Sequence, residues 1–137
     1  GFANQKNSTH AGDGLELINC AITNVCHCAP PQNKPTREEI QTCRPWLTDL
    51  VAILPLKVFL AFGQIAWRAT IDYLRHNDLY DGPIPKFNHG ATFRLPDGRV
   101  LLGSYHPSQQ NTFTGRLTRP MFNRIFKKAH RLLADAV

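Results

Sequence analysis

The sequence predicts an α/β fold, with helices on both faces of a central, mostly parallel four-stranded sheet in a three-layer α/β/α arrangement. Two runs of β-favouring residues, 17–24 and 56–63, have the length of buried strands. The second run is followed by a segment with helical spacing, which predicts one βαβ unit. The length suits one domain, so residues 1–137 are predicted to form a single domain.

The first predicted strand, 17–24, ends at Asn24 before a loop that contains two prolines. Because strands of open α/β sheets direct their carboxyl ends toward the ligand crevice, Asn24 is expected at the mouth of a site. Its amide offers a donor and an acceptor, which suits the edge of a base. Capping of the turn is the alternative role. Cys20, in the middle of this strand, is expected to pack in the core.

A helix is predicted immediately after Thr36, which forms a capping box with Glu39. Its apolar face, at helical spacing, consists of Ile40, Cys43, Leu47, Leu50, Val51 and Leu54. Pro45 falls inside this pattern, so we expect a kink or break close to Cys43. Cys28 lies in the proline-bounded loop before the helix, and a loop that doubles back would bring it near Cys43.

Residues 56–63 are apolar on both faces, as in a central strand covered by helices. The crossover helix is predicted at 64–77, with Trp67 and Tyr73 as packing residues. A loop follows at 78–88.

The C-terminal part predicts a hairpin and a basic amphipathic helix. Asp97-Gly98 is a typical hairpin turn, and it separates short strands around Phe93 and Val100. Helical spacing then predicts a helix from Thr118 to about Ala134. The neighbouring cations are Arg116, Arg119, Arg124, Lys127, Lys128 and Arg131. With a net charge of +6, they favour a polyanion partner, and a solvated helix face is the alternative.

The loop 104–118, between the last strand and the last helix, is the predicted functional segment. It combines His106 with hydroxyl and amide side chains, Gly115, Arg116 and a lone Leu117. Such side chains bind phosphates, and an exposed leucine beside them suits insertion between bases. A polar surface loop is the alternative interpretation.

Several other classes of protein are disfavoured. The sequence has no phosphate-binding P-loop, no G-x-G-x-x-G, no H-E-x-x-H and no G-x-S-x-G. The longest apolar region, 50–62, is interrupted by Pro55 and Lys57, so we expect no membrane span and a soluble protein. Neither a disulfide framework nor zinc-ligand spacing is evident among the four cysteines. The start has neither a signal-peptide pattern nor Met and resembles a cut end.

Four motifs in order resemble those of the family 5 (type b) uracil-DNA glycosylases. They are T-N-V-C-H-C-A-P-P-Q-N-K-P-T-R-E-E-I-Q-T-C-R-P-W-L, V-F-L-A-F-G-Q-I-A, H-G-A and S-Y-H-P-S-Q-Q-N-T-F-T-G-R-L-T. The resemblance implies an enzyme that flips uracil, or another deaminated base such as hypoxanthine, out of DNA and hydrolyses its N-glycosidic bond. A non-catalytic DNA-binding remnant of such an enzyme is the alternative.

The resemblance also assigns roles. His106 would donate a hydrogen bond to the departing base, with Asn33 as a second catalytic position and Asn24 in the base pocket. The positions that would hold the DNA backbone are Ser108, Asn111, Thr114, Gly115 and Arg116, with Leu117 as the wedge. The implied enzyme is a monomer in the cytoplasm of a prokaryote, associated with the nucleoid through DNA.

Cys28 and Cys43 match two of the four cysteines that hold a [4Fe-4S] cluster in this family, and the other two are expected upstream. Substitution by Cys20 or Cys26 stays open. The family's first strand and its glycine-rich loop, G-L-A-P-x-x-x-G, have no counterpart in the sequence. We therefore expect the 137-residue chain by itself to be a weak or inactive catalyst and marginally stable.

Overall fold

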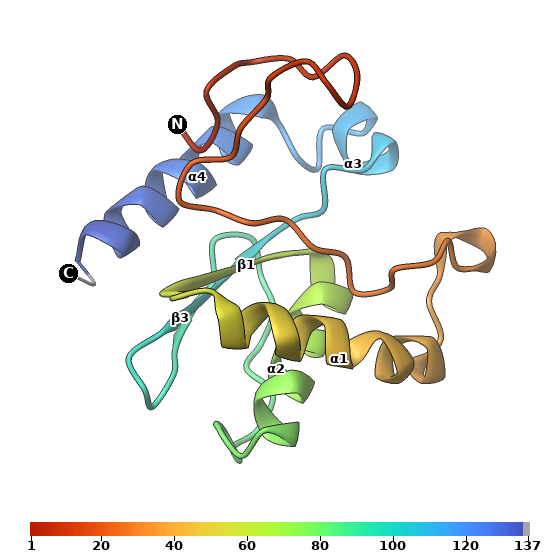
Figure 1. Cartoon of the computed structure of the whole chain (residues 1–137), viewed down its shortest axis with the longest axis vertical. Coiled ribbons are helices and arrows are strands. Elements are labelled where there is room, and N and C mark those ends of the chain that lie inside the picture. Colours follow the sequence, from red (N-terminus) through yellow and green to blue (C-terminus); the bar gives the residue numbers. More distant parts are fainter. Residues whose placement is uncertain (136–137) are drawn as a thin grey trace.

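Three strands form the sheet, β1 (Val58–Phe62), β2 (Thr92–Arg94) and β3 (Val100–Ser104), in the order β1-β3-β2. β1 runs parallel to β3, with Val58 opposite Val100 and Phe62 opposite Ser104, and β2 runs antiparallel to β3. The computed structural model describes residues 1–135. Within this range the sheet is mostly parallel, as predicted, and has three strands, none of them at 17–24 (Figure 1).

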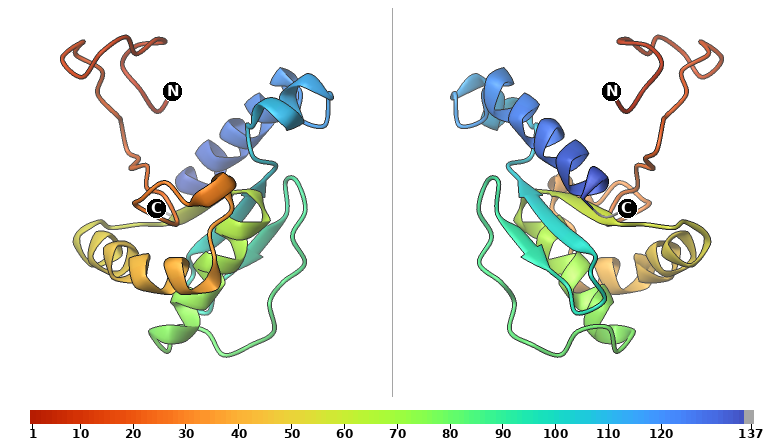
Figure 2. Two further views of the ribbon diagram at one scale, coloured as in Figure 1. Left: turned by 90° about the vertical axis from the view of Figure 1, so that its right-hand side faces the viewer. Right: turned by 90° about the vertical axis from the view of Figure 1, so that its left-hand side faces the viewer.

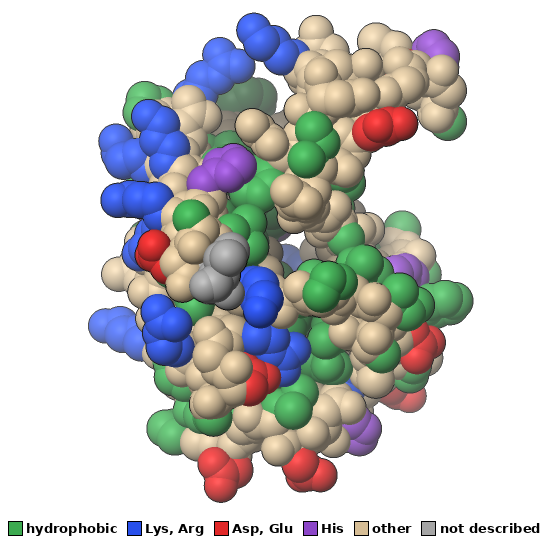
Figure 3. All heavy atoms as spheres, turned by 60° about the vertical axis from the view of Figure 1, so that its left-hand side comes forward, with side chains coloured by type: hydrophobic (Ala, Val, Ile, Leu, Met, Phe, Trp, Pro, Cys, Tyr) green, Lys and Arg blue, Asp and Glu red, His purple; other side chains and the backbone are tan. Residues whose placement is uncertain are grey.

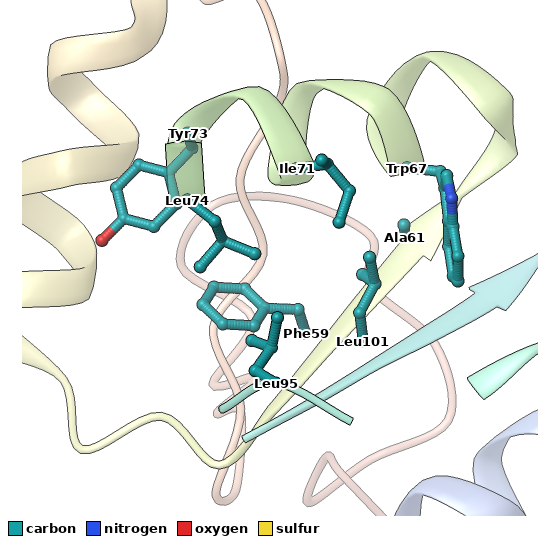
Figure 4. Packing of buried hydrophobic residues seen from close by; sticks show 8 residues of the cluster. All are labelled: Phe59, Ala61, Trp67, Ile71, Tyr73, Leu74, Leu95 and Leu101. Atoms are coloured by element: carbon teal, nitrogen blue, oxygen red, sulfur yellow. The ribbon is translucent and has the colours of Figure 1, made fainter. Parts of the chain in front are cut away.

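Helices cover both faces of this sheet, as the three-layer prediction requires (Figure 2). Side chains of a strand alternate between faces, so neighbouring strands build two separate cores. On one face, α2 (Gly63–His76) packs on β1 and β3, and α1 (Arg37–Ile53) packs on α2. Figure 4 shows this larger core, which consists of Phe59, Ala61, Trp67, Ile71, Tyr73, Leu74, Leu95 and Leu101. On the other face, α4 (Arg119–Ala134) buries Ile125 and Ala129 against Leu102.

The capping box that predicts α1 is present. Thr36 Oγ1 accepts a hydrogen bond from the Glu39 backbone N–H at 3.2 Å, and Glu39 Oε2 accepts one from the Thr36 N–H at 2.7 Å. Of the predicted kink or break at Pro45, the break is wrong, because α1 continues through this residue, and the kink stays a prediction. A proline inside a helix removes one backbone hydrogen bond. The cap at one end and the packing of Leu47 and Val51 on the α2 core at the other offset that loss.

The predicted strand at 17–24 is absent. Only an isolated bridge joins Ala3 to Leu17, and Leu17, Ile18 and Ile22 are 41%, 45% and 77% exposed. Cys20 is half-buried, with its thiol 3.5 Å from the Phe2 carbonyl oxygen, and does not belong to either core. A strand needs a neighbour for its backbone hydrogen bonds. Within residues 1–135 the second edge of β1 is unpaired, so the segment 17–24 does not bond to this sheet.

The C-terminal elements agree with the predictions. The turn at Asp97-Gly98 joins β2 to β3, and Thr118 caps α4 by accepting a hydrogen bond from the Met121 N–H at 3.4 Å. Two short helices that the sequence pattern does not predict are η1 (Pro31–Asn33) and α3 (Gln109–Phe113). No helix in the described part of the chain is long and apolar enough to cross a membrane.

Candidate nucleic-acid site at the end of strand β3

His106 is exposed and follows the end of β3 by two residues. Because β1 and β3 are parallel and in register, it stands at the shared carboxyl edge of both strands. Gly63, the first residue of α2, has a φ of +89°, and a Cβ built there would lie 3.4 Å from His106 Cβ. The start of α2 therefore lies directly beside the imidazole-bearing residue.

Asn111 fixes the backbone of the loop that follows His106. Its Nδ2 donates a hydrogen bond to the His106 carbonyl oxygen at 2.9 Å, and its own carbonyl accepts one from the Leu117 N–H at 2.9 Å. Its backbone N–H donates to Ser108 Oγ at 3.3 Å, so Ser108 caps α3. In this structure the side chains of Ser108 and Asn111 hold the loop in shape.

The next three residues of the loop, 114–116, differ in how much of each is free to contact a ligand. Thr114 Oγ1 donates to the Gln110 carbonyl at 2.7 Å. Gly115 has a φ of +74° and open space where a Cβ would be. The exposed Arg116 places its guanidinium carbon 4.9 Å from the centroid of the Tyr105 ring. The cation–π contact orients this charge at the surface of the loop.

Leu117 is not the exposed leucine that the sequence suggested, because only 3% of it is accessible. Its backbone N–H bonds inward to Asn111. The exposed apolar residue of the loop is Phe113, at 83%. The sequence reasoning missed it, although the polar run Gln109–Thr112 before it offers no apolar partner within one helical turn.

His89, from the H-G-A motif, connects three segments near the site. Its Nδ1 accepts a hydrogen bond from the Tyr105 N–H at 3.2 Å. Burial lowers the pKa of His89, a hydrogen bond with the Met121 backbone opposes this, and the nearby Arg124 lowers the pKa further. A neutral imidazole thus links the end of β3 to the start of α4.

The cations of α4 are mostly available to a partner. Figure 3 shows lysine and arginine side chains gathered along the side of the molecule that carries α4. Lys128 is the exception, because its ammonium donates to the Gly90 carbonyl at 2.7 Å. The other four cations of α4 are exposed, namely Arg119, Arg124, Lys127 and Arg131.

Asn24 and Asn33 are exposed, and within residues 1–135 neither side chain forms a hydrogen bond with the His106 loop. Two hollows, of about 600 Å³ and 680 Å³, lie elsewhere. The first lies between α1 and α2, and its lining includes Arg37, Arg44, Arg68 and Arg75. Neither hollow includes a predicted site residue.

The loop before α1 doubles back toward Cys43, as expected. The His27 backbone N–H lies 3.4 Å from Cys43 Sγ, and burial raises the pKa of Cys26, as do the nearby thiols of Cys43 and Cys28. All four cysteines are free. Among the described residues, however, no group of three or more histidine, cysteine or acidic side chains is arranged to hold a metal ion. These residues do not by themselves form the site of a four-thiolate cluster.

Comparison with known proteins identifies relatives along most of the chain. The sequence model of the uracil DNA glycosylase superfamily matches residues 1–130. A type-5 uracil-DNA glycosylase of Thermus thermophilus is 47% identical over 122 residues, which are 88% of this chain and 54% of that protein. Type-5 enzymes of Mycobacterium bovis and Pyrobaculum aerophilum are 42% and 34% identical, over 96% and 94% of the chain and 49% and 54% of their own lengths. The chain therefore spans about half the length of these curated relatives.

Proposed function

The chain belongs to the uracil-DNA glycosylase superfamily, among its type-5 members, and from this premise we propose that the protein carrying it removes uracil from DNA. The reaction hydrolyses the N-glycosidic bond and leaves an abasic site. Other deaminated bases, such as hypoxanthine, are proposed as further substrates. The base must leave the stack before its glycosidic bond can be reached.

The position of His106 is the observation that carries this proposal. It stands exposed at the carboxyl edge of β1 and β3, with Gly63 beside it and its carbonyl held by Asn111. As the glycosidic bond breaks, negative charge develops on the departing base. A hydrogen bond from the imidazole to a base carbonyl oxygen would stabilise that charge, and a neutral histidine is able to donate it.

The same loop would hold the DNA. Arg116, already oriented by Tyr105, supplies a cation for a phosphate, and Gly115 leaves room for the backbone of the strand to approach. The loop is held in shape by hydrogen bonds of three side chains, Ser108, Asn111 and Thr114. We propose that the polar atoms of these side chains that are not used within the loop bind the DNA backbone. Asn24 and Asn33 are proposed to line the base pocket, Asn33 as a second catalytic residue. We propose a monomer that acts on DNA in the prokaryotic cytoplasm.

The test compares the full-length protein carrying this chain with its His106→Ala variant on duplexes containing uracil or hypoxanthine. Abasic-site formation is read by alkaline cleavage. We expect the variant to lose about 100-fold or more in rate, the typical cost of one stabilising donor. His76→Ala, which removes an exposed histidine at the end of α2, is the matched control and should retain full activity.

The second candidate is a DNA-binding protein without glycosylase activity. It is favoured by the exposed cations of Arg116 and α4 beside the loop, which suit binding of DNA without any chemistry. In that case the wild type would bind duplex DNA but release no base, and His106→Ala would behave like the wild type. Base release by the wild type and its loss in the variant would exclude this alternative.

We further propose that Cys28 and Cys43 supply two of the four thiolates of a [4Fe-4S] cluster, with the other two outside this chain. The His27 backbone N–H lies 3.4 Å from Cys43 Sγ, and Cys28 is the next residue along the chain. This proximity supports a common cluster site for Cys28 and Cys43. Base hydrolysis needs no electron transfer, so the cluster would have a structural role. About four irons per full-length protein, and a loss of iron in Cys43→Ser, are the expected results; iron-free, colourless protein purified without oxygen would contradict the proposal.

A further inference from the structure

We propose that Phe113 is the side chain that enters the duplex beside the base that leaves it. This positioning role rests on the proposed function and names a residue for it. Phe113 ends the short helix α3, in the same loop as His106 and Arg116. Figure 1 shows α3 standing out from the sheet, just before the start of α4.

The exposure of Phe113 sets it apart from the other apolar residues of its loop. At 83% accessible, it has the largest exposed fraction among the exposed large hydrophobic side chains of the described chain. Leu117, which the sequence suggested as a wedge, is 3% accessible and its backbone is bonded to Asn111. Transfer of an exposed phenyl ring from water into a base stack is favourable, because its apolar surface is buried. The ring also stacks on a base and so replaces the contacts of the base that has left.

The loop also holds Phe113 in a fixed place. Thr112 Oγ1, just before it, donates to the Ser108 carbonyl at 3.0 Å, and Thr114 Oγ1, just after it, donates to the Gln110 carbonyl at 2.7 Å. Asn111 ties this turn to the His106 carbonyl. Because these hydrogen bonds fix the backbone around Phe113 before DNA binds, less conformational entropy is lost when the side chain inserts.

The charges around Phe113 fit a nucleic acid rather than an apolar protein surface. Arg116 is exposed three residues further along, Arg119 begins α4, and the segment 105–118 contains no acidic residue. Phosphate contacts would position the duplex, and the ring would then occupy the space between bases. The other strongly exposed apolar residues, Ile22, Trp46 and Ile53, lie in the N-terminal segment and on α1.

The test measures uracil release by the full-length protein and its Phe113→Ala variant on three substrates, a U:A duplex, a U:G duplex and single-stranded DNA. Unpairing costs most in the U:A duplex and nothing in the single strand. We expect a loss of about 10-fold in kcat on U:A, a smaller loss on U:G and no loss on the single strand. Phe113→Trp should restore the U:A rate, and Ile53→Ala, an exposed apolar control, should leave all three rates unchanged.

A second readout separates this inference from the proposed function. A fluorescent 2-aminopurine next to a non-hydrolysable 2′-fluoro-deoxyuridine reports unstacking on binding, without chemistry. Fluorescence should rise with the wild type and stay low with Phe113→Ala. If the wild type releases no uracil but still raises the signal through Phe113, the proposed base release fails, whereas insertion of Phe113 into the duplex stands. Equal rates or equal fluorescence for both proteins on the U:A duplex, or no rise with the wild type, would overturn the inference.

Discussion

At the scale of single residues, Gly103 shows how closely the strand that carries the site is packed. A Cβ added to it would lie 2.9 Å from the Asn88 carbonyl oxygen and 3.1 Å from the Trp67 ring. The Asn88 backbone is held by two hydrogen bonds of 2.8 Å that join Gly103 to the nearby residues Gly90 and Ala91. Trp67 is 1% exposed, and its indole N–H donates to the Pro85 carbonyl at 2.8 Å, so neither neighbour is free to move. Gly103→Ala should therefore lower the free energy of unfolding by about 1–3 kcal/mol in urea titrations. Gly12→Ala, where the nearest atom is 3.7 Å away, should be neutral, and equal stabilities for the two variants would contradict this packing.

His89 makes stability depend on pH. Burial lowers its pKa in the folded protein, with Arg124 adding to the shift, so below about pH 6.5 the unfolded chain takes up a proton that the folded chain resists. Stability from this residue is present above the unfolded pKa and is lost as the pH falls through the folded pKa. Unfolding midpoints in urea should decrease between pH 7.5 and pH 5.5. His89→Gln should flatten this dependence, and an unchanged slope would show that His89 does not cause it.

Residue by residue, the sequence was most informative for the exposed polar residues of the loop after β3. His106 lies accessible at a strand end, as expected, and Arg116 is an exposed cation. The sequence could not separate Leu117 from Phe113, because the turn of α3 and the Asn111 hydrogen bonds decide which of them faces water. The sequence also could not show that the Lys128 ammonium donates a hydrogen bond to the Gly90 carbonyl, since these residues are 38 positions apart.

At the scale of elements, the capping box at the start of α1 is a measurable contribution to stability. Thr36→Ala removes the acceptor for the Glu39 N–H, so it should cost about 1 kcal/mol, seen as a lower unfolding midpoint by circular dichroism. Thr42→Ala, on the exposed side of the same helix, is the matched control. Because alanine is the better helix former, this control should be neutral or slightly stabilising. A similar loss in both variants would mean that the cap is not responsible.

The elements found from the sequence are those whose signals are local. Capping residues, helical spacing and the Asp97-Gly98 turn are each contained in a few residues, and α1, α2, β3 and α4 follow from them. The segment 17–24 has the composition of a strand but not the structure, since a strand depends on a partner elsewhere in the chain. Pro45 shows the converse, a local signal for a break that the rest of its helix overrides.

At the scale of the whole molecule, positive charge lies on two sides of the sheet. The exposed cations of α4 lie on one face, next to the His106 loop, and four arginines line the hollow between α1 and α2 on the other. The net charge of +6 alone does not say which face would bind the DNA of the proposed function. We propose that phosphates contact the α4 face, because the loop that carries His106 and Arg116 leads directly into α4.

Two double variants of equal charge test this assignment. Arg119→Gln with Lys127→Gln removes two cations from α4, and Arg37→Gln with Arg68→Gln removes two from the α1–α2 hollow. Each phosphate contact contributes about 0.9 to the dependence of log K on log salt, so the first pair should reduce that slope by about 2 and weaken binding to any duplex. The second pair should leave the slope unchanged, since loss of net charge acts mainly through weak, long-range attraction. Titrating a fluorescent duplex at several salt concentrations measures both slopes, and a reduced slope in the second pair alone would place the DNA on the opposite face.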